Sequence, residues 1–253
     1  MTSPHWQLQT PISAIVFDCD GTLSSIEGVN ELARNKGVYD VIEAMTTEAM
    51  ERSGLNPQLY QQRLQLIHPS EQQVHSLAQQ YFAHRVEDVE AVISLLQRLN
   101  KMIYLVSAGV NPAVSLFGEN LHIPPSHIYA VNLSFDAAGN YLDYDHQSPL
   151  IHNMGKRNIV AMLQSEHPDL VHIGDGLNDY VTHDILTRFI GYGGVYYRKN
   201  MNERCQYYIK TFSLAPLLPL CLTQMESMQL TAEESTLYQK GMRAIHDQQV
   251  KTG

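Results

Sequence analysis

The chain of 253 residues has only three cysteines, Cys19, Cys205 and Cys221. An odd number of cysteines without metal-ligand spacing disfavours a disulfide framework and a zinc site, and reduced thiols fit a cytoplasmic protein. The apolar stretch 212–222 is interrupted by two prolines and falls well short of the roughly 20 residues that cross a bilayer. Residues 1–10 have neither a basic start nor an apolar centre, so they do not resemble a secretory signal. We therefore expect a cytoplasmic protein without membrane attachment.

Basic residues are also scarce, with 17 Lys and Arg against 26 Asp and Glu and a formal net charge of -9. No basic run or aromatic-basic alternation is present, which argues against nucleic-acid binding. There is no internal repeat, low-complexity tract or long linker. Hydrophobic residues make up 44% of the chain, enough for one large domain or for a core with a small additional domain.

Two aspartates, Asp18 and Asp20, follow a continuous apolar and β-branched run at residues 12–17. Such a run is typical of a buried parallel strand, and open α/β sheets bind ligands beyond the carboxyl ends of their strands. Two neighbouring carboxylates repel each other unless a cation or a shared proton compensates. The pair therefore indicates a site for a hard cation such as Mg2+. Taken alone, an Asp-x-Asp pair is equally compatible with a solvated loop or a helix cap.

Two further strand patterns end in polar residues of the same kind. Residues 101–106 lead into Ser107-Ala108-Gly109, where a hydroxyl group and backbone amides could hold an anion. Residues 170–173 lead into a segment that contains Asp175 and Asp179. Between them, Lys156 lies near the start of a predicted helix, where the helix dipole already favours phosphate. We expect these groups to converge at one edge of a sheet.

Taken in chain order, these four motifs resemble the haloacid dehalogenase superfamily. Within it, the chain resembles the phosphoserine phosphatase family over residues 11–212, because the similarity continues through the segment that follows the first motif. The stretches that carry this resemblance are residues 27–33, 45–46, 49–50, 63–67, 69–70 and 189–194. The resemblance implies an α/β fold, with a Rossmann-like parallel-sheet core and a small helical cap inserted after the first strand.

The domain boundaries follow from this resemblance and from the helical patterns. Residues 10–24 and 88–212 would form the catalytic core, and residues 25–87 a cap of four short helices that selects the substrate. Residues 213–253 would form a C-terminal extension. In it, a capping box of Thr231 and Glu234 precedes a helix that either mediates a homodimer or docks on its own core.

The resemblance assigns Asp18 as the nucleophile that forms an aspartyl phosphate, and Asp20 as the general acid and base. Mg2+ would be held by Asp18, the backbone carbonyl of Asp20, Asp175 and Asp179. Ser107 and Lys156 would bind the phosphate oxygens. The other substrate contacts would come from Glu27 (ammonium), Arg63 (carboxylate), Met50, Ala108, Gly109 and Asn178. Without the resemblance, Glu27 and Arg63 would be interpreted as solvated charges on helix surfaces.

The chain departs from the family pattern near the substrate, where Glu51, Arg52 and Asn56 replace two glycines and a phenylalanine. Ala108 and Asn178 also differ from the usual residues. The favoured function is Mg2+-dependent hydrolysis of phosphoserine, with a small phosphomonoester as the substrate and no nucleic acid or membrane as a partner. One alternative is a phosphatase or phosphotransferase for a phosphorylated amino alcohol, phosphohomoserine or a sugar phosphate. Another is a non-catalytic binding protein on the same fold.

Overall fold

The computed structural model of the chain describes residues 4–34, 36–50 and 54–253. Its centre is an eight-stranded sheet in the order β4-β3-β2-β1-β5-β6-β7-β8. All neighbouring strands are parallel except the two edge pairs, β3 with β4 and β7 with β8. The strands are β1 (Ala14–Phe17), β2 (Met102–Asn111), β3 (Ile128–Phe135), β4 (Tyr141–Tyr144), β5 (Leu170–Gly174), β6 (Arg188–Tyr192), β7 (Tyr207–Ile209) and β8 (Val250–Thr252).

The first strand lies in the middle of this sheet, and all of its residues are buried. It pairs with β2 on one side and β5 on the other, with Phe17 opposite Leu105 and Ile173. The carboxyl ends of the three strands therefore open at the same edge. Helices complete the mixed α/β architecture, which confirms the predicted fold class.

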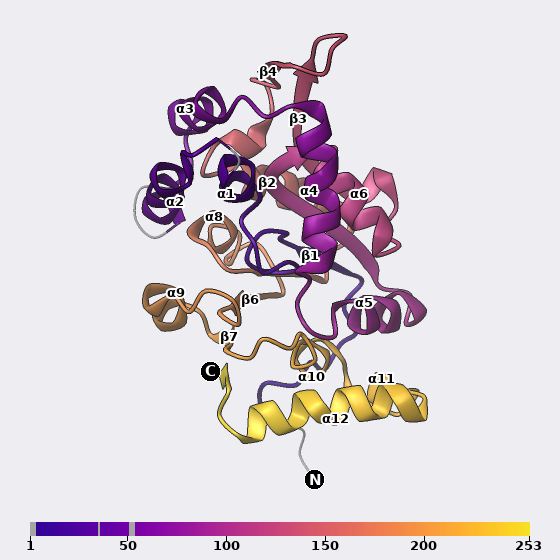
Figure 1. Cartoon of the computed structure of the whole chain (residues 1–253). Helices are drawn as coiled ribbons and strands as arrows, with labels where there is room; N and C mark the ends of the chain where they lie inside the picture. Colours follow the sequence, from indigo (N-terminus) through magenta and orange to yellow (C-terminus); the bar gives the residue numbers. More distant parts are fainter. Residues whose placement is uncertain (1–3, 35, 51–53) are drawn as a thin grey trace.

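Four helices follow β1 in the chain, in the segment predicted to be helical. They are α1 (Gly28–Arg34), α2 (Tyr39–Glu48), α3 (Pro57–Ile67) and α4 (Glu71–Ala83). At the turn between α3 and α4, His68 is left-handed with φ 43, and Ser70 and Gln73 form a capping box. Figure 1 shows these helices gathered at the end of the molecule that carries the β3–β4 hairpin. A hydrogen bond joins these helices to the β3–β4 hairpin, because Glu71 N donates to Gly139 O at 2.9 Å.

Helices also connect the remaining strands. The longest of them, by residue range, leads into β5 and carries Lys156 in its first turn. The helix that follows Asn111-Pro112 is α6. These connecting helices are α5 (Val89–Arg98), α6 (Ala113–Asn120), α7 (Gly155–Glu166), α8 (Leu177–Tyr180) and α9 (Lys199–Arg204), with short 3-10 turns at Pro125–His127 and Pro149–Ile151.

One strand is longer than its apolar pattern predicted. The pattern ends the second strand at Val106, whereas β2 continues to Asn111. Its pairing with β3 shifts register between Val106 and Val110, which face Tyr129 and Val131. Extra residues on one strand form a bulge that redirects side chains without ending the pairing. Ser107, Ala108 and Gly109 therefore lie in an irregular part of a strand and not in a free loop.

The C-terminal extension packs against the molecule's own core (Figure 1). It contains α10 (Leu217–Cys221), α11 (Gln224–Ser227), α12 (Ala232–His246) and the edge strand β8. Thr231 and Glu234 form the predicted capping box. Glu234 also pairs with Arg98 of α5 at 2.5 Å, and Lys240 pairs with Asp88 at 2.6 Å. The helix therefore docks on its own chain, and a homodimer formed through it stays a prediction.

Candidate active site

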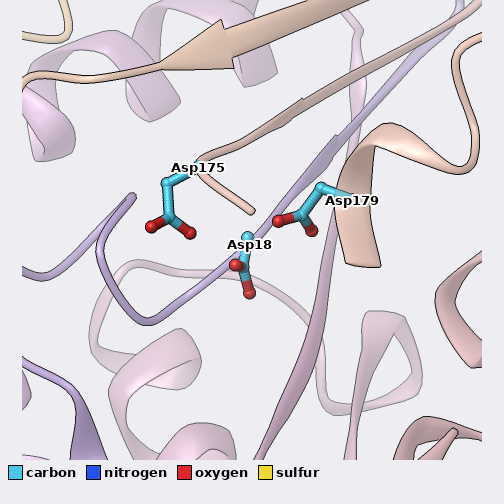
Figure 2. Close-up of side chains that lie close together, drawn as sticks. All are labelled: Asp18, Asp175 and Asp179. Carbon is cyan, nitrogen blue, oxygen red and sulfur yellow. The ribbon is translucent and has the colours of Figure 1, made fainter. Parts of the chain in front are cut away.

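Three carboxylates meet beyond the ends of the central strands. Asp18 directly follows β1 and Asp175 directly follows β5, and these strands are parallel neighbours. Asp179 joins them from the first turn of α8. One oxygen of each carboxylate lies within 4.8 Å of the others, and all three residues are buried (Figure 2). The convergence expected from the strand patterns is therefore present.

Lys156 lies between two of these carboxylates. Its Nζ atom is 2.6 Å from Asp18 Oδ1 and 2.6 Å from Asp179 Oδ1. Burial alone would lower the pKa of Lys156, but Asp179 and Asp18 outweigh burial and raise it. The ammonium group therefore stays charged at neutral pH and offsets part of the negative charge of the cluster.

The same cluster shifts the pKa of each aspartate differently. Burial, followed by Asp179, raises the pKa of Asp18 well above its ordinary value, although Lys156 opposes the shift. Burial also raises the pKa of Asp175, to about 6. For Asp179, burial is outweighed by Lys156 and His172, which lower its pKa. An additional cation would stabilise the ionised forms of Asp18 and Asp175.

Asp175 pairs with Arg198, a residue that none of the sequence motifs indicated. Arg198 donates to Asp175 Oδ2 from Nη2 at 2.9 Å and from Nε at 3.2 Å. Among the residues that the structure describes, the buried Oδ1 atom of Asp175 has no hydrogen-bond partner. Three converging carboxylates, one with an unpaired buried oxygen, form an all-oxygen donor set that fits a hard divalent cation.

His172 is a further contact that the motifs did not indicate. This buried residue of β5 has Nε2 3.4 Å from Asp179 Oδ1 and Nδ1 2.8 Å from Thr182 Oγ1. Burial lowers the pKa of His172. The imidazole and Lys156 therefore approach the same oxygen of Asp179 from different elements.

Asp20 is oriented separately from the three clustered carboxylates. Its Oδ1 atom accepts hydrogen bonds from the Tyr81 hydroxyl at 2.8 Å and from Gly28 N at 2.5 Å. Its Oδ2 atom accepts from Ser107 Oγ at 3.2 Å, and Ser107 Oγ in turn accepts from Gly109 N at 2.9 Å. A side chain at Gly28 would collide with Tyr81, because its Cβ would lie 2.0 Å from the hydroxyl oxygen.

One cavity joins the carboxylates to residues of the inserted helices. Its lining includes most of the predicted site residues and, in addition, Thr46, Leu55, Tyr60 and Leu64. The predicted residues in it are Asp18, Asp20, Glu27, Met50, Arg63, Ala108, Gly109, Lys156 and Asn178. Ser107 contacts this site through Asp20.

Glu27 and Arg63 bring an acidic and a basic group into this cavity while being only 8% and 7% exposed. The reading of both as solvated surface charges is therefore wrong. Glu27 Oε1 and Arg63 Nε are buried and have no hydrogen-bond partner within residues 4–34, 36–50 and 54–253. Burial, followed by Asp20, raises the pKa of Glu27 to about 8. Burial also lowers the pKa of Arg63. Both groups would gain from a ligand that carries the opposite charge.

Of the three sequence departures near the substrate, Asn56 does not line the cavity. Its side chain caps α3 by accepting a hydrogen bond from Leu59 N at 2.9 Å. Glu51 and Arg52 lie outside the described residues. The aromatic side chain that α3 contributes to the cavity is Tyr60.

In the part of the chain that the structure describes, no helix is both long and apolar enough to cross a membrane. Cys19, Cys205 and Cys221 are buried free thiols. None of the surface of Cys19 is exposed, which indicates a packing role.

A model of haloacid dehalogenase-like hydrolases matches residues 12–182. The chain belongs to this family of hydrolases. Among curated proteins it is similar to the phosphoserine phosphatase of Homo sapiens, with 31% identity over 201 residues that cover 79% of this chain and 89% of that protein. The phosphoserine phosphatase of Drosophila melanogaster is also 31% identical over 201 residues, which cover 78% of this chain and 74% of that protein.

Solved structures agree on the fold. A phosphoserine phosphohydrolase-like protein from Francisella tularensis has a TM-score of 0.72 and 20% identity, covering 79% of this chain and 96% of its own. A substrate-bound phosphoserine phosphatase complex has a TM-score of 0.69 and 23% identity, covering 81% and 96%.

Proposed function

We propose that the protein is a Mg2+-dependent phosphoserine phosphatase. The observation that carries this proposal is a single cavity lined by Asp18 and Lys156 and also by Glu27 and Arg63. Phosphoserine is a phosphate ester whose leaving group carries both an ammonium and a carboxylate, so its ammonium would stabilise the ionised form of Glu27 and its carboxylate would pair with Arg63. The similarity to phosphoserine phosphatases supports the same substrate.

In the first half-reaction, a carboxylate oxygen of Asp18 attacks phosphorus and the bond from phosphorus to the serine oxygen breaks. Asp18 Oδ1 is already held by Cys19 N at 2.7 Å and by Lys156, so we assign the attack to Oδ2. The carboxyl group of Asp20 gives its proton to the departing serine oxygen. The product of this step is serine, with the phosphoryl group attached to Asp18.

In the second half-reaction, the Asp20 carboxylate takes a proton from a water molecule whose oxygen attacks phosphorus. The bond between phosphorus and Asp18 breaks, which releases phosphate and restores both aspartates. Lys156 and Ser107 hold the phosphate oxygens. A lysine fixed between two carboxylates is a preorganised charge for the transition state, and such groups usually make the largest catalytic contribution.

We assign Mg2+ to Asp18, Asp175, Asp179 and the backbone carbonyl of Asp20. The support for this assignment is the all-oxygen donor set and the unpaired Oδ1 of Asp175 among the described residues. When bound, the ion would neutralise phosphate charge and orient the phosphoryl group.

For the leaving group, we assign the substrate ammonium to Glu27 and the carboxylate to Arg63. Met50, Ala108, Gly109 and Asn178 complete the substrate contacts. Residues 25–87 would act as the cap that selects the leaving group, over a core of residues 10–24 and 88–212, with residues 213–253 as an extension. We infer a cytoplasmic role in serine biosynthesis, which the three reduced thiols and the proposed product support.

The proposal is tested by phosphate release from O-phospho-L-serine, phosphoethanolamine, phosphohomoserine and a sugar phosphate, with and without Mg2+ after chelation. Wild type and Asp18→Asn are compared side by side. We expect a preference for phosphoserine that requires the ion and that the substitution abolishes. A preference for another ester would keep the chemistry and refute the substrate, whereas no release from any ester would favour a binding protein.

A further inference from the structure

Tyr60 is a cavity residue that the proposed chemistry does not use. It lies on α3 one turn before Arg63 and is only 4% exposed, yet it lines the same cavity as the catalytic groups. A tyrosine buried this deeply normally has a defined partner for its hydroxyl group. Its contacts show which parts of the molecule it joins.

The hydroxyl group of Tyr60 crosses from the inserted helices to the core. It donates a hydrogen bond to the backbone carbonyl of Ala108 at 3.1 Å. Ala108 lies in the irregular part of β2 next to Ser107, which we assign to phosphate binding. The bond therefore connects the helix that carries Arg63 with the backbone that positions the phosphate.

The ring of Tyr60 faces two other groups. The guanidinium carbon of Arg63 lies 5.6 Å from its centroid, within the range of a cation–π contact. The ring of Tyr144 from β4 lies 5.2 Å from it on an edge of the sheet. Tyr60 is therefore held by the hairpin and by the core, and it contacts the guanidinium group.

Arg63 has few other groups to fix its position. Its Nη1 atom is 3.4 Å from Thr46 Oγ1, a long hydrogen bond, and within the described part of the chain its buried Nε atom has no partner. An arginine side chain loses considerable rotamer freedom when it is ordered. An aromatic wall that holds the guanidinium before substrate arrives reduces this cost at the moment of binding.

We propose that Tyr60 is a positioning residue that gives the enzyme its preference for leaving groups with a carboxylate. It does so by holding Arg63 at a set place relative to the phosphate site. This inference rests on the proposed function, in which Arg63 binds the substrate carboxylate. Glu27 precedes α1 and is not on α3, so a shift of α3 affects carboxylate recognition and leaves ammonium recognition in place.

The experiment compares Tyr60→Phe, which removes only the hydroxyl, with Tyr60→Leu, which also removes the ring. Tyr104→Phe is the matched control. Tyr104 is 5% exposed and its hydroxyl lies 2.9 Å from His167 Nε2, but it stands near the opposite end of β2. For each variant, kcat and KM are measured with phosphoserine and with phosphoethanolamine, which lacks the carboxylate. Thermal unfolding shows that each variant is folded.

For Tyr60→Phe we expect kcat/KM on phosphoserine to fall by roughly threefold to tenfold, mainly through KM, as the loss of one hydrogen bond predicts. Tyr60→Leu should fall further. Phosphoethanolamine hydrolysis should change by less than about twofold in both, and Tyr104→Phe should match wild type on both esters.

The proposed substrate and the proposed role of Tyr60 are refuted by different results. If wild type does not prefer phosphoserine to phosphoethanolamine, the proposed substrate is refuted, and the inference falls with it. If wild type prefers phosphoserine but the Tyr60 variants lose activity equally on both esters, or on neither, the substrate stands and the role of Tyr60 is refuted. Should Tyr60→Leu fail to fold, Tyr60→Phe alone decides.

Discussion

Substituting Glu27 by Gln is expected to make the protein more stable and less active. The carboxyl group is buried and its pKa is raised from an ordinary value of 4.5 to about 8, by burial first and then by Asp20. A raised pKa means that the folded protein keeps this proton over a pH range in which the unfolded chain releases it. Glutamine has a similar shape without the ionisation.

The size of the effect follows from the two pKa values. Below about pH 4.5 both states hold the proton, so Glu27 introduces no pH dependence. Between pH 4.5 and about 8 the unfolded chain binds fewer protons, so the free energy of unfolding of wild type falls by up to roughly 1.4 kcal/mol per pH unit. At pH 7 the free energy of unfolding of wild type is therefore about 3 kcal/mol lower than below pH 4.5, as far as Glu27 is concerned. Glu27→Gln should not show this decrease.

Activity should change in the opposite direction. The loss of a charge-assisted hydrogen bond to the substrate ammonium is worth about 1.5–3 kcal/mol, so kcat/KM on phosphoserine should fall by roughly tenfold to 150-fold. A site that binds a charged ligand is often destabilising to the free protein.

Urea unfolding of wild type and Glu27→Gln between pH 5 and pH 8 measures the difference. A chelator is included, because a cation bound at Asp175 would lower the pKa of Glu27. Glu31→Gln is the control, four residues further along the chain in α1, since Glu31 pairs with the exposed Arg34 at 2.8 Å and should contribute little to stability. Free energies that run parallel over this pH range for wild type and Glu27→Gln, or a variant less stable than wild type at pH 8, would refute the reasoning.

Two other substitutions test the site and its surroundings. Lys156→Met removes the ammonium that lies 2.6 Å from both Asp18 and Asp179, so kcat should fall by roughly 10²–10³-fold and the pKa of Asp179 should rise. The assay is steady-state kinetics with excess Mg2+, and a kcat within tenfold of the wild-type value would contradict the prediction. Asn56→Ala removes the cap of α3 and should lower the free energy of unfolding by about 1 kcal/mol, with little change in kcat. A large loss of kcat without a loss of stability would instead place Asn56 in the cavity.

Much of the catalytic cluster could be predicted because its signals are local. The apolar run before Asp18 and the strand pattern before Asp175 each predict a buried parallel strand, and parallel neighbours bring their carboxyl ends to one edge. The capping box at Thr231 depends on side chains three residues apart, so it too was predictable and is confirmed. The chain's similarity to known hydrolases adds the identity of the family.

The partners of these residues depended on long-range packing. Arg198 reaches Asp175 across 23 residues, Tyr60 reaches Ala108 across 48, and Tyr81 reaches Asp20 across 61. None of these contacts leaves a periodicity or a motif in the sequence. The extent of β2 was mispredicted for a related reason, since its pairing beyond Val106 depends on β3 and not on its own apolar pattern.

The amino-acid sequence by itself determined which side chains follow the buried strands, because strand burial and helix capping are encoded by neighbouring residues. Only the tertiary structure decided which of those side chains lose water. The pKa of Glu27 shows the difference: the sequence identifies a glutamate, but the pKa of about 8 arises from burial in the fold and from the nearby Asp20. Desolvation and Coulomb interactions depend on distance in space, and that distance is set by the fold.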